Sequence, residues 1–213
     1  MAWADIETIR NISGISTDTF SDGDVQEFIE SAQKEVNSKV CQTVIREYVE
    51  YIDQTRKNDI NGSNTRFYVK NWKGNYLGDY DYDGDIDTSD IKVYSVASDG
   101  TETELVPSSI SIPNCYFNLT SAPTNVKLYV SYSYLSFNPV EPDARLEQAV
   151  TYLAASYIYV GDDADSIKFG NVSLSSGSKN LYNQYYEKYL NLINQLLENS
   201  TGGAIWGESK VQI

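Results

Sequence analysis

The chain has 213 residues, of which 41% are hydrophobic and 22% are charged, a composition that suits one or two globular domains with a real core. The formal net charge of −14 argues against a protein that binds DNA by neutralising phosphates. The chain lacks histidine, the commonest general base and transition-metal ligand, and its cysteines, Cys41 and Cys115, form no paired motif typical of a zinc site or a disulfide scaffold.

Tyrosine is unusually abundant, with 18 residues against 6 phenylalanines and 3 tryptophans. A tyrosine has an apolar body and a polar tip, so it suits surfaces that are half-buried or that become buried on assembly. The sequence leaves two interpretations open, an assembly protein or a tyrosine-rich β domain.

The N-terminal part is predicted to be helical. Residues 4–12 place isoleucines on one side of a short helix, which Gly14 ends, and Ser21 or Asp22 then caps a long helix that is continuous or broken near residues 37–38. Apolar residues recur along it at steps of three and four, as expected for one buried face. They are Val25, Phe28, Ile29, Ala32, Val36, Val40, Val44, Tyr48 and Ile52.

No targeting or membrane-spanning segment is expected. The first thirteen residues are acidic and lack the basic and apolar regions of a signal peptide. The most apolar run, residues 149–160, is shorter than the ~20 residues that a helix needs to cross a bilayer.

After a linker at residues 57–64, the hydrophobic period changes from the helical value to two. Asp99 and Gly100 form a hairpin turn signal between two of the resulting strands. Residues 65–135 are therefore predicted to form a small antiparallel β domain. Its expected strands are residues 65–70, 91–96, 103–106, 109–112, 116–119 and 126–134.

The C-terminal part returns to the helical period. Asp143 is expected to cap a helix that ends near residue 160, and residues 161–178 form a polar loop with a possible hairpin. A last helix is predicted over residues 179–198. The tail that follows has apolar residues but no core of its own.

These elements indicate an α+β fold. A helical layer of three to five helices carries a small antiparallel β domain inserted between its second and third helical segments. The expected organisation is a helical part at 1–60, the inserted β domain at 61–138, a second helical part at 139–200 that packs on the first, and an extended arm at 201–213.

The sharpest chemical motif is an aspartate-rich stretch that matches the calcium loops of EF-hand and dockerin-type proteins. A hard cation takes six to eight oxygen ligands, and this loop offers oxygens at alternate positions. Gly84 stands where the loop needs a sharp turn. The predicted metal ligands are Asp79, Asp81, Asp83, Asp85, Asp87 and Asp90.

The second half of the loop is expected to bind calcium in three different ways. Asp85 would offer its backbone carbonyl, Asp87 a direct or water-mediated contact, and Asp90 the closing carboxylate. Magnesium is disfavoured because the loop supplies too many protein oxygens. The flanks are not predicted helices, so we expect a calcium loop between strands and not a calcium-sensor domain. The alternative is a solvated acidic turn without an ion.

The order of parts resembles the head–tail connector, or adaptor, family of tailed bacterial and archaeal viruses. The resemblance covers about residues 3–198 and depends on order, because each motif alone is a common apolar spacing. The motifs are a Gly-Ile step after the first helix, a Ser-Asp-capped helix, a hairpin and a Tyr-rich strand in the β insertion, and a later helix. They stand at residues 12–15, 21–36, 96–105, 130–134 and 142–154. The aspartate-rich loop departs from the family at large.

The resemblance implies a structural virion protein and not an enzyme. It would form a homo-oligomeric ring, usually twelve-fold, in the neck of the virion after assembly in the host cytoplasm. Its partners would be the portal protein and a tail or tail-completion protein, and it would enclose DNA without binding it specifically and without a membrane. The acidic charge fits a channel along which DNA slides.

Two other functions remain open from the residues alone. The aspartate-rich loop suits a secreted calcium-binding β module of the dockerin or adhesin kind, although helices on both sides of the β domain argue against it. The many carboxylates leave an acidic hydrolase possible, but the sequence contains no nucleophile-elbow, phosphate-loop or metalloprotease motif.

The C-terminal tail is interpreted as a docking arm for the portal or a neighbouring subunit. Gly202 and Gly203 uncouple it from the last helix, and its alternating end fits a strand added to a partner's sheet. A frayed terminus is the alternative. The predicted anchors are Ile205, Trp206, Val211 and Ile213.

Overall fold

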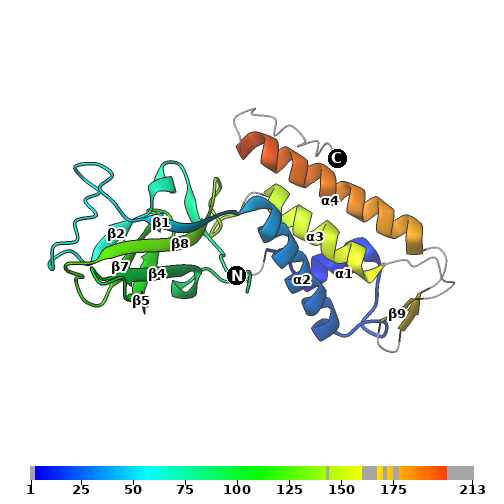
Figure 1. Ribbon diagram of the computed structural model, residues 1–213. Helices are drawn as coiled ribbons and strands as arrows, with labels where there is room; N and C mark the ends of the chain where they lie inside the picture. Colours follow the sequence, from blue (N-terminus) through cyan, green and yellow to red (C-terminus); the bar gives the residue numbers. More distant parts are fainter. Residues whose placement is uncertain (1–2, 143, 160–166, 170–171, 175–177, 201–213) are drawn as a thin grey trace, which may run out of the picture. The chain divides into compact units, whose positions relative to one another are not determined.

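The computed structural model describes residues 3–142, 144–159, 167–169, 172–174 and 178–200 (Figure 1). It confirms the α+β class, with helices and antiparallel sheets. The chain divides into two compact units. Residues 37–142 form the β unit, whereas the segments before residue 37 and after residue 142 together form the helical unit.

The helical unit draws its helices from both ends of the chain. The Asp5 side chain caps the first helix by accepting from the Thr8 amide, and Gly14 ends it with a left-handed φ of 69°. The Ser21 hydroxyl caps the second helix by accepting from the Asp24 amide at 3.2 Å. The helices are α1 (Ile6–Ser13), α2 (Asp22–Val40), α3 (Ala144–Ile158) and α4 (Ser178–Ser200).

Helix α3 is the central helix of this unit, and most of its residues are buried. It lies alongside α4 and contacts α1 (Figure 1). Two tyrosine hydroxyls reach one carboxylate inside the unit, because Tyr157 donates to Glu35 at 2.7 Å and Tyr189 at 3.3 Å. Burial raises the pKa of both tyrosine hydroxyls, and the nearby Glu35 carboxylate raises it further. The predicted hairpin forms between α3 and α4 as β9 (Ile167–Phe169) and β10 (Val172–Leu174).

The long helix ends earlier than its apolar pattern predicted. It stops at Val40, and β1 (Gln42–Tyr48) follows immediately as a strand. Val44 and Tyr48 fit a helical stripe by spacing, but the β-branched run from Thr43 to Ile45 favours an extended backbone. Antiparallel pairing with the distant strand β8 then stabilises the strand over a continued helix. Residues 37–60, expected in the helical part, accordingly belong to the β unit.

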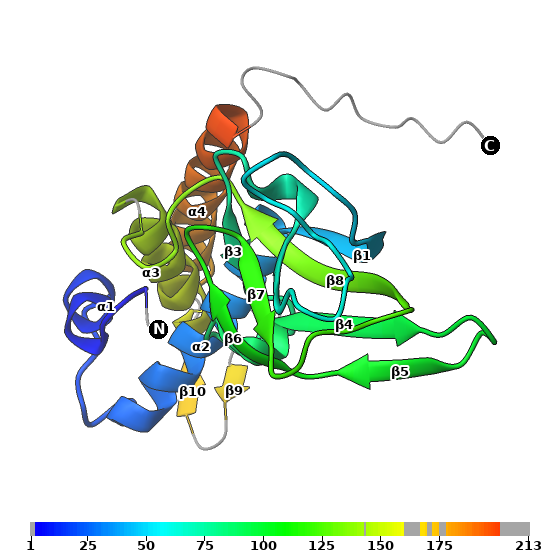
Figure 2. The same cartoon turned by 90° about the vertical axis from the view of Figure 1, so that its left-hand side faces the viewer.

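The β unit contains two antiparallel sheets. The larger has the order β1-β8-β4-β5, with β3 also paired to β8, and the smaller has the order β2-β7-β6. Figure 2 shows β8 between β1 and β4. The remaining strands and short helices are β2 (Arg66–Tyr68), η1 (Lys70–Trp72), β3 (Tyr76–Gly78), η2 (Thr88–Asp90), β4 (Ile91–Val96), β5 (Glu102–Leu105), β6 (Pro107–Ser111), β7 (Tyr116–Leu119) and β8 (Lys127–Leu135).

The predicted strands all form, and two further strands were missed. The hairpin between β4 and β5 turns at Asp99 and Gly100, where Gly100 has a φ of 86° and the Asp99 side chain accepts from the Thr101 amide at 2.9 Å. The missed strands are β1 and the three-residue β3. A shared core holds the unit together, with Phe67, Val93, Phe117, Leu128, Val130 and Tyr132 fully buried. Among the helices that the structure describes, none combines the length and apolarity needed to cross a bilayer.

Candidate metal centre

The aspartate-rich loop interrupts what is otherwise one strand. Strands β3 and β4 both run antiparallel to β8 along the edge opposite β1. Gly78, the last residue of β3, pairs with Ser133, and Ile91, the first residue of β4, pairs with Tyr132. Residues 79–90 therefore leave the sheet at one rung of the ladder and return at the next.

This arrangement brings the two ends of the loop together before any ion binds. Consecutive residues of a strand are ~3.4 Å apart, so the sheet itself fixes the separation of the loop ends.

The backbone is tightly packed at Gly78, where the loop leaves β3. A β-carbon added to Gly78 would lie 3.0 Å from both the Cys41 sulfur and a methyl carbon of Leu135. Glycine at this position lets the strand pass under the thiol.

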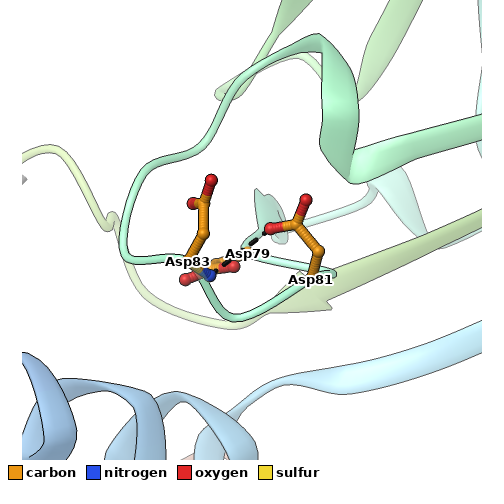
Figure 3. Close-up of side chains that lie close together, drawn as sticks. All are labelled: Asp79, Asp81 and Asp83. Atoms are coloured by element: carbon orange, nitrogen blue, oxygen red, sulfur yellow. Dashed lines mark hydrogen bonds between the residues drawn. The ribbon is translucent and has the colours of Figure 1, made fainter.

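Three of the predicted ligands converge in the structure. One carboxylate oxygen from each of Asp79, Asp81 and Asp83 lies within 4.8 Å of the others (Figure 3). Backbone turns produce this convergence, because Tyr82 and Gly84 adopt positive φ values of 58° and 101°. The turn predicted at Gly84 is thus confirmed.

Asp79 is the buried member of the cluster, with 2% of its surface exposed. Its Oδ2 accepts hydrogen bonds from the Gly84 amide and from the Asn37 side chain, both at 2.9 Å. Its Oδ1 is buried and has no hydrogen-bond partner among the described residues. Burial, together with the charges of Asp83 and Asp81, raises the pKa of the Asp79 carboxyl above its ordinary value. A buried carboxylate oxygen without a donor can be satisfied by a bound cation or, because the pKa is raised, by a proton.

The second half of the loop is held by its own carboxylates. Asp90 is buried, and its Oδ1 accepts hydrogen bonds from the amides of Tyr80 and Asp81. Its Oδ2 accepts a hydrogen bond from the Asp87 amide at 2.7 Å. The Asp87 side chain caps η2 by accepting from the Ser89 amide at 2.6 Å. Burial raises the pKa of the Asp90 carboxyl to about 6. Asp87 and Asp90 thus brace the loop in this structure and do not join the three-carboxylate cluster.

A ligand role for Asp85, Asp87 and Asp90 stays a prediction. The Asp85 amide donates to Asp83 at 2.9 Å, which orients the carboxylate of the third predicted ligand. The Ser89 hydroxyl donates to Asp81 at 3.1 Å and orients the carboxylate of this second predicted ligand. The network holds the three converging side chains in place from within the loop.

Sequence patterns missed the residues that support the loop from outside. Asn37 lies at the end of α2, 42 positions from Asp79, and its Oδ1 is a second buried oxygen without a hydrogen-bond partner among the described residues. The only available signal was a polar residue on the buried face of a helix. Burial, then the charge of Asp79, raises the pKa of the nearby Cys41 thiol to about 12, so this cysteine is a neutral neighbour.

The donor set fits a hard divalent cation. It consists of carboxylate oxygens on a short loop with a positive-φ glycine at its centre, with no described histidine or thiolate in the cluster. The predicted docking arm, with Ile205, Trp206, Val211 and Ile213, lies outside the described residues.

The sequence matches no protein-family model, and no curated protein is significantly similar to it. A solved structure of the neck of an empty GTA particle, computed with C6 symmetry, contains a similar chain. The identity is 13% and the TM-score is 0.33, over 84% of this chain and 87% of that one. A likeness this low leaves the function to be argued from the residues of this chain.

Proposed function

We propose that this protein is a structural subunit of a tailed virus, a head-to-tail adaptor that forms a ring between portal and tail, and not an enzyme. The observation that carries the proposal is the order of parts. Helices from both ends of the chain build one unit, and the β unit is inserted between α2 and α3. This is the order of the adaptor family that the sequence resembles.

The ring itself is part of the proposal. Rings close by heterologous contacts, in which each subunit uses two different patches of its surface. Helix α4 offers suitable side chains, since the half-buried rings of Tyr182 and Tyr186 stack at a centroid distance of 5.5 Å. We propose a homo-oligomer, twelve-fold by family resemblance, that contacts the portal on one side and a tail or tail-completion protein on the other. Its place would be the virion neck, after assembly in the host cytoplasm.

The proposed channel wall repels DNA and does not hold it. A net charge of −14 opposes the neutralisation of phosphates on which non-specific DNA binding depends. The purified protein should bind duplex DNA weakly at all ionic strengths. Tight binding with a steep salt dependence would contradict a passive wall.

We also propose that calcium binds at Asp79, Asp81 and Asp83 and stiffens the β unit, with Asp85, Asp87 and Asp90 completing its oxygen ligands. The unpartnered Oδ1 of Asp79 supports this assignment. Because the loop connects two segments of one sheet edge, an ion there would brace the sheet rather than move helices.

Electron microscopy of virions tests the adaptor proposal directly. A neck reconstruction should show density for this chain in a ring below the portal. The docking arm has its own test, deletion of residues 202–213, which should leave the melting temperature nearly unchanged and weaken attachment to the portal or the next ring. A neck without this chain would refute the adaptor role, whereas truncated protein that assembles as well as full-length protein would refute only the arm.

The second candidate function is a secreted calcium-binding β module, which the metal loop alone favours. That role predicts a monomer that does not join virions and that binds a cell-surface or scaffold partner when calcium is present. The genes beside this one discriminate cheaply, because a portal or capsid gene next door supports the adaptor and a secretion signal upstream supports the module.

A further inference from the structure

A second candidate site lies on the outer face of the smaller sheet, in the β unit. It is a half-open pocket of about 300 Å³, at the lower end of the range for small-ligand sites. This size suits one or two side chains better than a cofactor. We call it the arginine pocket, and its lining residues are Thr55, Arg56, Arg66, Tyr68, Asn114 and Tyr116.

Side chains on one face of the paired strands β2 and β7 form the aromatic floor of this pocket. Phe67 and Phe117 pair across β2 and β7 and face the core, where both are fully buried. The neighbouring residues point the other way, so that Tyr68 and Tyr116 meet edge to face at 5.4 Å. The aromatic floor of the arginine pocket is therefore set by the same register as the core.

Each arginine stacks on an aromatic ring. The guanidinium carbon of Arg56 lies 3.3 Å from the ring centre of Trp72 and 5.8 Å from that of Tyr68. The guanidinium carbon of Arg66 lies 4.3 Å from the ring centre of Tyr116. Stacking helps to hold both guanidinium groups in place. Arg56 Nη1 already donates to Asp53 and Thr55, so Arg66 is the arginine whose terminal N–H groups can bind a ligand.

The two arginines differ in whether a carboxylate neutralises them. Arg56 donates to Asp53 at 3.1 Å, so this pair carries no net charge. Arg66 donates its Nε to the Asn118 side chain at 3.2 Å, but no carboxylate of the described residues forms an ion pair with it. In a chain with 30 acidic and 16 basic residues, an arginine on an exposed strand without an acidic partner is unexpected.

We propose that the arginine pocket binds a carboxylate from an acidic segment of another protein chain. The planar fork of Arg66 matches a carboxylate in two parallel hydrogen bonds, and the tyrosine rings cover the methylene groups beside it. Arginine, tyrosine and tryptophan are also the residue types that carry most of the binding energy in protein interfaces. This site does not depend on assembly into a ring.

Charge selects a protein segment over a nucleic acid as the occupant. A duplex presents a dense row of phosphates to the whole surface, and a chain with a net charge of −14 repels it. A short acidic segment brings only one or two charges into the pocket, where Arg66 meets them locally.

Nuclear magnetic resonance of the arginine side chains tests the proposal. Full-length protein labelled with ¹⁵N is titrated with a blocked triglutamate peptide, and the Nε–H signals of Arg56 and Arg66 are followed. The expected result is a saturable shift of the Arg66 signal, larger than that of the buried Arg56 Nε–H and absent with a blocked triglutamine peptide. Inorganic phosphate and a short DNA duplex are the competing ligands, and equal or tighter binding of either would overturn the assignment to a protein carboxylate.

Matched substitutions locate the interaction. Arg66→Gln should weaken triglutamate binding about tenfold, the loss expected for one charge-assisted pair of hydrogen bonds. Arg46→Gln removes the same charge from an arginine that already pairs with Glu102, and should leave the affinity unchanged. Equal losses in both variants would show a general charge effect and refute the pocket. Arg66→Lys keeps the charge and loses the fork, so it should also bind weakly even if the glutamine variant fails to fold.

Discussion

Replacing Asp79 by asparagine should change the stability of the β unit with opposite signs in the absence and presence of calcium. The substitution keeps the acceptor that bonds Asn37 and Gly84. It exchanges the buried, unpartnered Oδ1 for a neutral NH₂ group beside the carboxylates of Asp81 and Asp83. The variant therefore loses one of the three clustered charges, and with it one of the proposed calcium ligands.

The structure sets the size of the effect without calcium. Two unit charges 4.8 Å apart repel by about 1 kcal/mol in water and by about 3 kcal/mol at an effective dielectric constant of about 20. Asp81 and Asp83 are exposed, so their mutual repulsion lies near the lower figure, while the two pairs that include buried Asp79 lie between the two figures. Asp79→Asn removes both of these pairs and should stabilise the calcium-free protein by at least about 1 kcal/mol after screening.

With calcium the order should reverse. An ion that binds only the folded state stabilises it by about 2.7 kcal/mol at a concentration one hundred times the Kd, which raises the melting temperature of a chain of this size by about 5–10 °C. The variant should lose most of this gain. Melting curves in chelator and in calcium, with calorimetric titration of the ion, measure both effects.

Asp59→Asn is the matched control, because it removes one charge from an exposed residue outside the loop. It should respond to calcium as the wild type does. If the wild type melts at one temperature in chelator and in calcium, the loop is a solvated acidic turn. If Asp79→Asn gains as much from calcium as the control does, the ion binds elsewhere.

Three further outcomes follow from packing and burial. Cys41 and Cys115 should react slowly with a thiol reagent at pH 8 until urea unfolds the chain, because burial raises the pKa of both thiols to about 12. Gly78→Ala should destabilise the β unit by about 1–3 kcal/mol in urea melts, since its β-carbon would overlap the Cys41 sulfur, whereas Gly23→Ala, with nothing closer than 3.6 Å, should not. Unfolding free energy should fall as pH rises above about 10, because Tyr157 keeps its proton in the folded state after the unfolded state has lost it, and Tyr157→Phe should flatten this slope.

Elements with a clear local period were predictable from the sequence. Strands β4 and β7 form over the residues predicted for them, since each has alternating apolar residues and nearby turn signals. Strand β1 was not predictable. Its Val44 and Tyr48 continue the helical spacing of α2, and the strand forms by pairing with β8, more than eighty residues away. Strand β3 has only three residues, too few for any pattern, and only its pairing defines it.

In the candidate metal centre, too, local sequence determines some features and distant residues determine others. The convergence of Asp79, Asp81 and Asp83 is local, because alternate residues around a glycine turn determine it. The burial of Asp79 is not local, since Asn37 and the sheet edge produce it. Sequence therefore indicated which residues offer oxygens, and the fold shows which of those oxygens lacks a hydrogen-bond partner.

The position of the loop in the sheet also explains how a calcium-type loop forms without flanking helices. In an EF-hand, two helices hold the ends of the loop, and their movement relays the binding of the ion. Here Gly78 and Ile91 pair with neighbouring residues of β8, so the sheet holds both ends one rung apart. Repulsion among the clustered carboxylates acts within the loop that these strands hold, and a bound cation would reverse it. Because the sheet fixes both ends of the loop, binding of an ion would stabilise a rigid part of the chain and would not move one element relative to another.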